Sequence, residues 1–346
     1  MVRASTHPTM STMPITLASI PSALETREGL PRPDWEIIAA WVEAHVAEAE
    51  YESTWSNLAR DWCDTLAAAL PSGYARSESD NFLMLANGDG KFAERQLAWC
   101  EHARRKILDT LPGVARDEGY NDGGYGKHVV FCFYTEEYYT YIADSSPEEG
   151  EFGGSSGTFI DRGYGHFVLQ RIDGAATDRV IAHELNHALV RHLSLPIWLD
   201  EGLTQVMEDM IVETSYFQVD AEIVRRHRRY WNAKSIDTFW SGESFFSADE
   251  GQELSYHLAQ VLFRNLMADY PRNILDFLAA ADYSDAGNAA LLKVCGVALE
   301  SRVAQFLGAG DWSPGARYGE DRAKDPVDPS SPREQGRTQS KHPKFP

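Results

Sequence analysis

Two histidines and a glutamate close together in the sequence have the types and spacing of a metal-dependent hydrolytic site. His183, Glu184 and His187 form the pattern H-E-x-x-H within an apolar run. Residues four apart on an α-helix are offset by about 40°, so both imidazoles leave the same side of it. Two such nitrogens can share one Zn²⁺, and the intervening carboxylate can accept a proton from a water held by the metal.

A catalytic zinc site needs a third protein ligand, and acidic candidates follow the histidines closely. Pro196 interrupts the chain, and a second helical run begins near Leu199 with Asp200 and Glu201 in its first turn. A helical hairpin can fold Glu201 back over the first helix. A third histidine is excluded, because Leu193 stands where the longer pattern H-E-x-x-H-x-x-G-x-x-H requires one.

The helix that carries the two histidines is predicted to be buried. Its other side chains are largely apolar: Val180, Ile181, Ala182, Leu185, Ala188, Leu189 and Val190. Burying two imidazoles is costly unless each has a partner. A surface helix with two solvated histidines is therefore the less favoured interpretation.

The same stretch resembles a known family. His183-Glu184-x-x-His187, followed by Pro196-x-Trp198-Leu199-x-Glu201-Gly202-Leu203, is similar to the gluzincin metallopeptidases and, within them, to the bacterial peptidase MA-like group. The resemblance implies that His183, His187 and Glu201 bind zinc and that Glu184 is the general base. It is close over residues 180–205, looser over residues 78–310, and does not extend to either end of the chain.

Glu201 is preferred to its neighbour Asp200 as the third ligand. The resemblance favours Glu201, and adjacent helical side chains point about 100° apart, so only one of them can face the metal. Asp200 is expected either to cap its helix or to hydrogen-bond a ligand histidine from the side away from the metal.

The resemblance also implies a substrate-binding strand. In gluzincins the strand nearest the site is an open edge that pairs with the substrate backbone. This role falls to residues 166–170, and thus to His166, Phe167 and Val168. A buried strand that is paired on both sides is the alternative.

A donor for the oxyanion is a further implication of the resemblance. Gluzincins commonly add a Tyr or His donor from the helical lobe beyond the third ligand. Tyr256 is expected to take this role, with His257 as its substitute. Simple packing of Tyr256 between the two lobes is the alternative.

Composition indicates a chain with enough apolar side chains for a sizeable core. Its 346 residues are 43% hydrophobic and include nine Trp, 15 Tyr and 15 Phe.

The net charge of −20 argues against a nucleic-acid partner, because phosphate contacts need clustered Lys and Arg. The sequence has no signal-like or membrane-spanning apolar run, so we expect a soluble cytoplasmic protein with no membrane partner. Its cysteines are widely spaced, so we expect free thiols.

The predicted fold class is α+β, with a small mixed sheet and flanking helices of zincin-like type, followed by a helical C-terminal lobe. We expect disordered tails over residues 1–30 and 311–346, a helical region over 31–77 and a metallopeptidase domain over 78–310. That domain divides into a sheet with the active-site helix, 78–210, and a helical lobe, 211–310. The apolar runs predict two helices within 34–70 with a break near 51–54, strands at 81–86, 128–134, 158–160 and 166–170, and an aromatic loop at 231–247.

The predicted function is zinc-dependent hydrolysis of peptide bonds in a peptide or protein substrate. Two alternatives stay open: a zinc-stabilised binding or regulatory protein without peptidase activity, and a metallohydrolase of a non-peptide amide. Glu184 counts against the first, because a purely structural zinc has no need of a base. The sequence leaves open the identity of the substrate, endopeptidase or exopeptidase action, and the oligomeric state.

Overall fold

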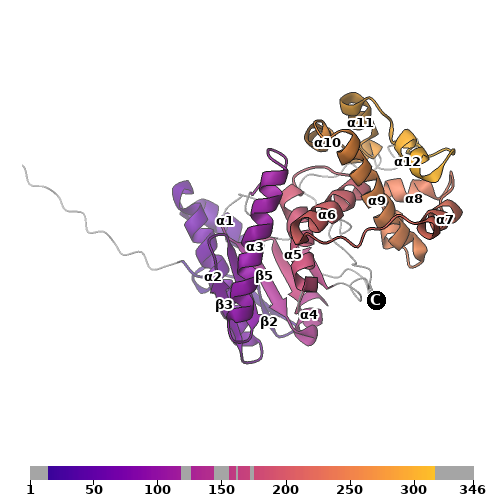
Figure 1. The fold of residues 1–346 in the computed structure, drawn as a ribbon. Coiled ribbons are helices and arrows are strands. Elements are labelled where there is room, and N and C mark those ends of the chain that lie inside the picture. The colour runs from indigo at the N-terminus through magenta and orange to yellow at the C-terminus, as the bar shows by residue number, and fades with distance from the viewer. Residues whose placement is uncertain (1–14, 118–125, 144–155, 161–162, 172–174, 316–346) are drawn as a thin grey trace, which may run out of the picture.

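The structure, a computed structural model, describes residues 15–117, 126–143, 156–160, 163–171 and 175–315. Within these residues the chain is mixed α/β, with a five-stranded mixed sheet, a two-stranded sheet and twelve α-helices. Figure 1 shows the sheet and its covering helices in one half of the molecule and a cluster of helices in the other. The prediction of a small mixed sheet followed by a helical lobe is confirmed at this level.

The N-terminal elements pack against the sheet and form part of its core. They are η1 Leu17–Ser19, β1 Leu24–Arg27, β2 Leu30–Pro33, α1 Trp35–His45, η2 Glu48–Glu50 and α2 Tyr51–Ala69. The expected disorder of residues 1–30 is wrong for residues 15–30, because Leu17, Ile20 and Ala23 are buried and β1 pairs with β2. Residues 1–14 lie outside the described residues.

The two predicted helices of this region are present, but the break between them lies earlier than expected. Val46 leaves the helical conformation with φ −111° and ψ 140°, and α2 already begins at Tyr51.

The five-stranded sheet has the strand order β3-β4-β5-β7-β6. Its strands are β3 Tyr74–Glu78, β4 Phe82–Asn87, β5 His128–Phe133, β6 Gly157–Ile160 and β7 His166–Gln170. The central strands β4, β5 and β7 are parallel, and β3 and β6 are antiparallel strands at the two edges. The sequence does not predict β3, because Y-A-R-S-E is mostly polar.

The prediction that residues 166–170 form an open edge is wrong. β7 pairs with β5 on one side and with β6 on the other, so its backbone cannot also pair with a substrate. The alternative, a strand paired on both sides, is confirmed. His166 and Val168 moreover face the side of the sheet that α2 covers, whereas Phe167 faces α5.

Side-chain alternation along the strands divides the apolar residues between two cores. In β5, Val130 and Cys132 face α3 Lys91–Thr110 and α5 Ala175–Val190. Val129, Phe131 and Phe133 face the opposite core, which contains α1, α2 and α4 Thr135–Ile142. Figure 1 shows α3 and α5 on the same side of the sheet. The helix with the H-E-x-x-H pattern therefore packs directly on the sheet.

α6 Ile197–Val212 leads from α5 into the helical lobe. The lobe continues with α7 Ala221–Tyr230, α8 Ile236–Ser241, η4 Glu243–Phe246, α9 Glu250–Asp269, α10 Ile274–Ala280, η5 Tyr283–Asp285, α11 Asn288–Cys295 and α12 Leu299–Leu307. The aromatic loop expected at 231–247 is wrong, because α8 and η4 occupy most of it and bury Phe239, Trp240 and Phe245. Among the described helices, none has the length and apolar character needed to cross a membrane.

The end of the described chain packs onto this lobe. Trp312 is buried, and its carbonyl accepts a hydrogen bond of 3.0 Å from Trp240 Nε1. The expected disorder of residues 311–346 is therefore wrong for residues 311–315, while residues 316–346 lie outside the described part of the chain.

Two contacts fix the start of α6 against the helical lobe. A Cβ atom at Gly202 would lie only 2.6 Å from the backbone oxygen of Ala259 in α9, so the two helices can approach this closely only through a glycine. One turn earlier, Trp198 is fully buried and its Nε1 donates to Ala286 O at 2.9 Å. The turn between these contacts carries the acidic candidates for the third ligand.

Candidate metal centre

α5 and α6 bring the three predicted ligands together. His183 and His187 lie one turn apart on α5, and Glu201 lies at the start of α6. The two Nε2 atoms are 3.1 Å apart, and Glu201 Oε2 lies 3.6 Å from His183 Nε2 and 3.7 Å from His187 Nε2. Among the described residues, these three form the group of His, Cys, Asp or Glu side chains that could hold a metal ion.

The distances within this ligand group fit a single tetrahedral cation. Zinc bonds of about 2.0–2.1 Å at tetrahedral angles would place neighbouring ligand atoms about 3.3–3.4 Å apart. The observed separations of 3.1, 3.6 and 3.7 Å bracket that value. Glu201 Oε2 is buried and accepts no hydrogen bond from the described residues, which suits an atom whose partner is a cation.

In both histidines Nδ1 is the outer nitrogen, which faces away from the ligand group, and Nε2 is the inner one. The partner of each Nδ1 determines whether the Nε2 of the same ring can offer a lone pair. His183 Nδ1 lies 3.1 Å from Glu208 Oε2, and His187 Nδ1 lies 3.1 Å from Asp200 Oδ1. Because carboxylate oxygens only accept, each Nδ1 carries the proton of its ring. Each Nε2 then offers a lone pair, and these atoms lie beside Glu201 Oε2. Three such atoms repel one another unless a proton or a cation lies between them.

Asp200 lies behind His187 and not among the ligands. Its Oδ1 is at ion-pair distance from His187 Nδ1, although the angles are poor for a hydrogen bond. Thr204 Oγ1 lies farther from the same nitrogen, at 3.4 Å, and accepts from Asn186 Nδ2 at 2.7 Å. The expected contact with a ligand histidine is thus present. Asp200 does not cap α6, because the residue at the cap is Pro196.

The electrostatics of the ligand group favour a cation. Burial lowers the pKa of His187, but the nearby carboxylates of Asp200 and Glu201 outweigh it and raise this pKa to about 10. Burial raises the pKa of Glu201 to about 8, with His187 acting in the opposite direction. When no metal is bound, protons are therefore retained at neutral pH, and a divalent cation would displace them.

Glu184, the predicted base, is fully buried beside the ligand group. Its negative charge contributes to the raised pKa of both His187 and Glu201, which shows its proximity to them. Its Oε2 accepts a hydrogen bond of 3.0 Å from the backbone N–H of Phe159. Phe159 belongs to β6, so the carboxylate of Glu184 is held at the edge strand of the sheet.

Tyr256, the predicted oxyanion donor, lies in α9 where this helix packs against α6. Its ring contacts Phe245 edge-on at a centroid distance of 5.2 Å, and its carbonyl accepts from Gln205 Nε2 at 3.0 Å. Gln205 lies one turn beyond Glu201 on α6. These contacts hold Tyr256 between α6 and η4, and its role at the oxyanion stays a prediction.

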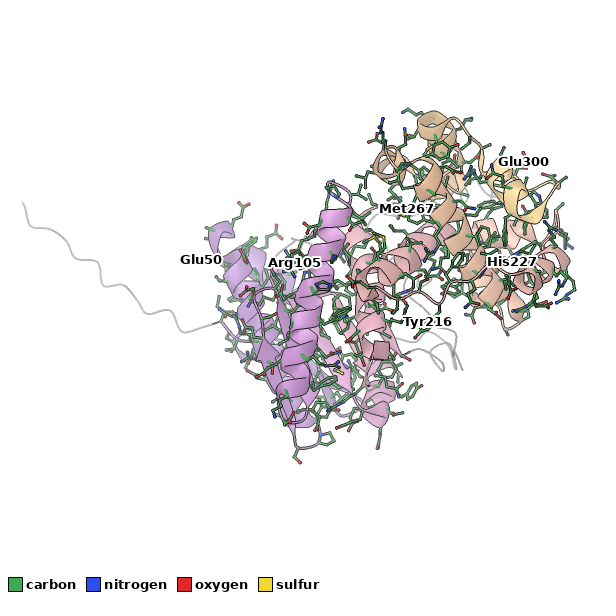
Figure 2. The ribbon with its side chains drawn as sticks, in the orientation of Figure 1. Glu50, Arg105, Tyr216, His227, Met267 and Glu300 are labelled. Atoms are coloured by element: carbon green, nitrogen blue, oxygen red, sulfur yellow. The ribbon has the colours of Figure 1, made fainter. Side chains whose placement is uncertain are left out.

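A second close pair of histidines lies in the helical lobe, where Figure 2 labels His227. His227 Nε2 is 2.9 Å from His257 Nδ1. Trp231 Nε1 donates to His227 Nδ1 at 3.0 Å, and His257 Nε2 lies 2.9 Å from the carbonyl oxygen of Gln218. Both ring nitrogens of His257 are thus bonded within this lobe, and its role as the substitute oxyanion donor stays a prediction.

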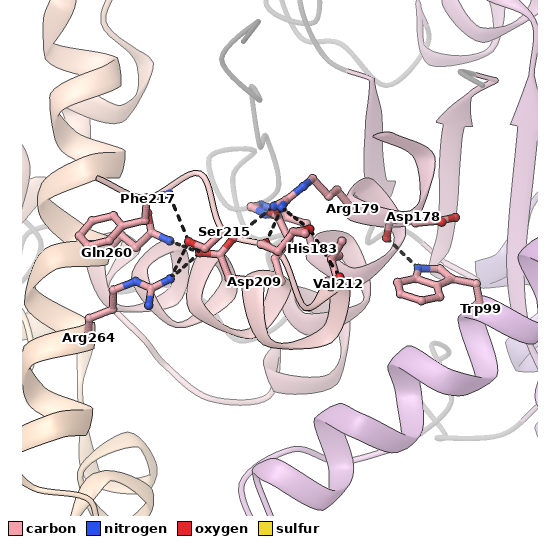
Figure 3. Close-up of polar contacts among 12 residues, drawn as sticks. Trp99, Asp178, Arg179, His183, Asp209, Val212, Ser215, Phe217, Gln260 and Arg264 are labelled. Atoms are coloured by element: carbon pink, nitrogen blue, oxygen red, sulfur yellow. Dashed lines mark hydrogen bonds and ion pairs between the residues drawn. The ribbon is translucent and has the colours of Figure 1, made fainter. Parts of the chain in front are cut away.

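A network of charged side chains links the ligand group to the helical lobe (Figure 3). Arg179 Nη1 donates to Glu208 Oε1 and, at 3.3 Å, to Asp209 Oδ1. Asp209 Oδ2 in turn accepts from Gln260 Nε2 at 2.9 Å and from Arg264 Nη2, both in α9.

The H-E-x-x-H pattern does not indicate Arg179 and Glu208, although helical spacing carries a signal for both. Arg179 precedes His183 by four residues, and Glu208 follows Glu201 by seven. Each therefore shares a helix face with a predicted ligand.

The chain matches no protein-family model and no curated protein. The resemblance to gluzincins stays an expectation from the sequence of the two helices that form this centre.

Proposed function

We propose that this chain is a zinc-dependent hydrolase of peptide bonds with a zincin-like fold, in which His183, His187 and Glu201 are the ligands. The observation that carries the proposal is the convergence of two Nε2 atoms and one carboxylate oxygen within 3.7 Å of one another. Structural zinc sites are almost always closed by four protein ligands, whereas three ligands leave a position for water or substrate.

The catalytic chemistry falls to Glu184. A bound zinc ion would polarise the scissile carbonyl and lower the pKa of water. Glu184 accepts the proton of the attacking water and delivers it to the leaving amine. The hydrogen bond from Phe159 N–H to Oε2 orients this carboxylate beside the ligand group.

The position of β6 supports a peptide as the substrate. β6 is the edge strand beside α5, and the N–H of Phe159 points to Glu184 and not to β7. An extended peptide that pairs with this edge would bring its backbone next to the ligand group. The substrate-binding role thus falls to the strand before β7.

Peptide cleavage by matched proteins tests this function. Zinc-loaded wild type and its Glu184→Gln variant are incubated with a peptide library, and the products are read by mass spectrometry. We expect Glu184→Gln to keep its zinc and to lose activity by about 10²–10⁴-fold, the contribution of a general base. Identical cleavage by both proteins would remove Glu184 from the mechanism.

A zinc-stabilised binding protein is the second candidate, and the burial of the site favours it. His183, Glu184, His187 and Glu201 are 1%, 0%, 4% and 6% exposed. This candidate predicts that zinc raises the melting temperature while neither protein cleaves any library peptide. Cleavage by wild type alone would exclude it.

A further inference from the structure

We propose that Glu208 and Arg179 act as a positioning pair for the metal centre: together they fix the tautomer and orientation of His183 and couple this ligand to the helical lobe. The inference rests on the proposed ligand role of His183. It concerns two residues that neither bind the metal nor touch a substrate.

Glu208 uses its two carboxylate oxygens for two different partners. Oε2 lies 3.1 Å from His183 Nδ1, and Oε1 accepts from Arg179 Nη1. The side chain of Glu208 is 10% exposed and that of His183 is 2% exposed, so water competes little for this contact. Arg179 lies one turn before His183 on α5, and Glu208 approaches both from α6.

This geometry has a direct consequence for metal binding. A ligating imidazole whose other nitrogen donates to a carboxylate is held in one tautomer and one orientation, and it becomes a more basic ligand. Glu208 provides that contact for His183, and Asp200 lies at the same distance of 3.1 Å from His187 Nδ1 but with poorer hydrogen-bond angles. Glu208 would be a costly buried charge next to Glu201 and Glu184, and the guanidinium of Arg179 offsets it.

Arg179 is itself held by segments outside α5. Its Nη2 donates to Thr214 Oγ1 at 3.2 Å, and its guanidinium lies 4.6 Å from the ring centroid of Tyr216. Its second carboxylate partner, Asp209, is bound by α9 through Arg264. Figure 2 shows Tyr216 near the junction of the two halves, and Figure 3 shows the contacts that converge on Asp209. The orientation of one ligand is thereby tied to the packing of the lobe.

Glu208→Gln is the sharpest test, with Asp209→Asn as its matched control. A glutamine has one acceptor oxygen, so its amide nitrogen must face either Arg179 or His183 Nδ1, and both are donors. We expect zinc affinity, measured by competition with a chelator, to fall about 10–100-fold. The absorption spectrum of the cobalt-substituted protein should shift as well. Asp209→Asn disturbs the same arginine but contacts no histidine, so its effect on affinity and spectrum should be much smaller than that of Glu208→Gln.

Arg179→Lys provides a second variant that keeps the positive charge. Lysine lacks the forked guanidinium that hydrogen-bonds both Glu208 and Thr214. We therefore expect zinc affinity to fall, but by less than in Glu208→Gln. The proposal is overturned if Glu208→Gln binds zinc as wild type does, or if Asp209→Asn weakens binding equally. Zinc affinity and the cobalt spectrum do not depend on peptide cleavage. The role of Glu208 and Arg179 can therefore be tested even if the protein binds zinc without hydrolysing peptides.

Discussion

Two pairs of histidines in this molecule have nearly the same internal distance but opposite surroundings. His183 and His187 approach to 3.1 Å between their Nε2 atoms, and His227 and His257 approach to 2.9 Å. In the first pair both outer nitrogens face carboxylates. In the second, one outer nitrogen faces the N–H of Trp231 and the other faces a backbone carbonyl.

The difference lies in where the protons are. Trp231 only donates and the carbonyl of Gln218 only accepts, so the pair of the lobe forms one directed chain. In this chain His227 Nε2–H donates to His257 Nδ1, and both rings are neutral. Two carboxylates impose the other arrangement on His183 and His187, because each Nδ1 must donate and the two Nε2 atoms then need a proton or a cation between them. Proximity of two imidazoles therefore does not by itself indicate a metal site.

His166, on the opposite face of the sheet from α5, follows the neutral arrangement. Its ring nitrogens lie 2.9 Å from the hydroxyl of Tyr141 and 2.8 Å from the carbonyl oxygen of Tyr164. Burial among aromatic rings lowers its pKa to about 3. Surroundings without carboxylates make a buried histidine a neutral part of the core.

The largest expected effect separates the two pairs by metal content. His183→Ala or His187→Ala should reduce bound zinc from about one ion per chain to near zero, because two remaining ligands hold zinc weakly. His257→Ala should leave zinc content unchanged. Elemental analysis of the purified proteins provides the measurement. One zinc per chain in both α5 variants would refute the site assignment.

The two acidic neighbours at the start of α6 should differ in the same assay. Glu201→Ala removes a ligand and should abolish stoichiometric zinc. Asp200→Ala removes only the partner of His187 Nδ1 and should weaken zinc affinity by about 10–100-fold. Chelator competition on both variants measures the two affinities. The reverse result, with zinc lost in Asp200→Ala and kept in Glu201→Ala, would exchange the two roles.

Tyr256 and His257 are neighbours on α9, and the oxyanion role of Tyr256 stays a prediction. If Tyr256 donates to the oxyanion, Tyr256→Phe should lower kcat by about 10²-fold, with KM and zinc content little changed. Phenylalanine keeps the ring that packs on Phe245, so a packing role predicts near-normal turnover. Steady-state kinetics with a cleaved peptide decide between the two, and full activity would end the catalytic assignment.

The smallest expected effect concerns the stability of the zinc-free protein. Its free energy of unfolding should depend on pH with opposite sign for the two histidine pairs. Burial lowers the pKa of His227 to about 3, below its unfolded value of about 6.5, so stability falls as the pH drops from about 6.5 toward 3. Against burial, Asp200 and Glu201 raise the pKa of His187 to about 10, so its contribution is complete below about pH 6.5 and is lost as the pH rises toward 10.

Urea unfolding at a series of pH values measures both slopes. Within its window, a fully shifted group changes the free energy of unfolding by about 1.4 kcal/mol per pH unit. His187→Gln should remove part of the alkaline loss and leave the acid loss intact. Two slopes of the same sign in wild type would contradict the proton assignment.

The sequence by itself determined the parts of this site that depend on neighbours along the chain. The spacing of His183 and His187 places both on one helix face, and Pro196 separates that helix from the one that carries Glu201. The apolar run of residues 128–134 likewise predicts β5, because a strand buried on both faces has no polar alternation. These features are local, so periodicity alone reveals them.

The tertiary structure decided what depends on partners distant in sequence. An apolar strand can be central or at an edge, because backbone hydrogen bonds to neighbouring strands leave no mark in its own residues. Only the order β5-β7-β6 shows that β6, and not β7, forms the edge beside α5. The protonation pattern of His183 and His187 is equally non-local. It depends on whether Glu208 and Asp200 of α6 face the outer nitrogens, and packing between α5 and α6 sets that choice.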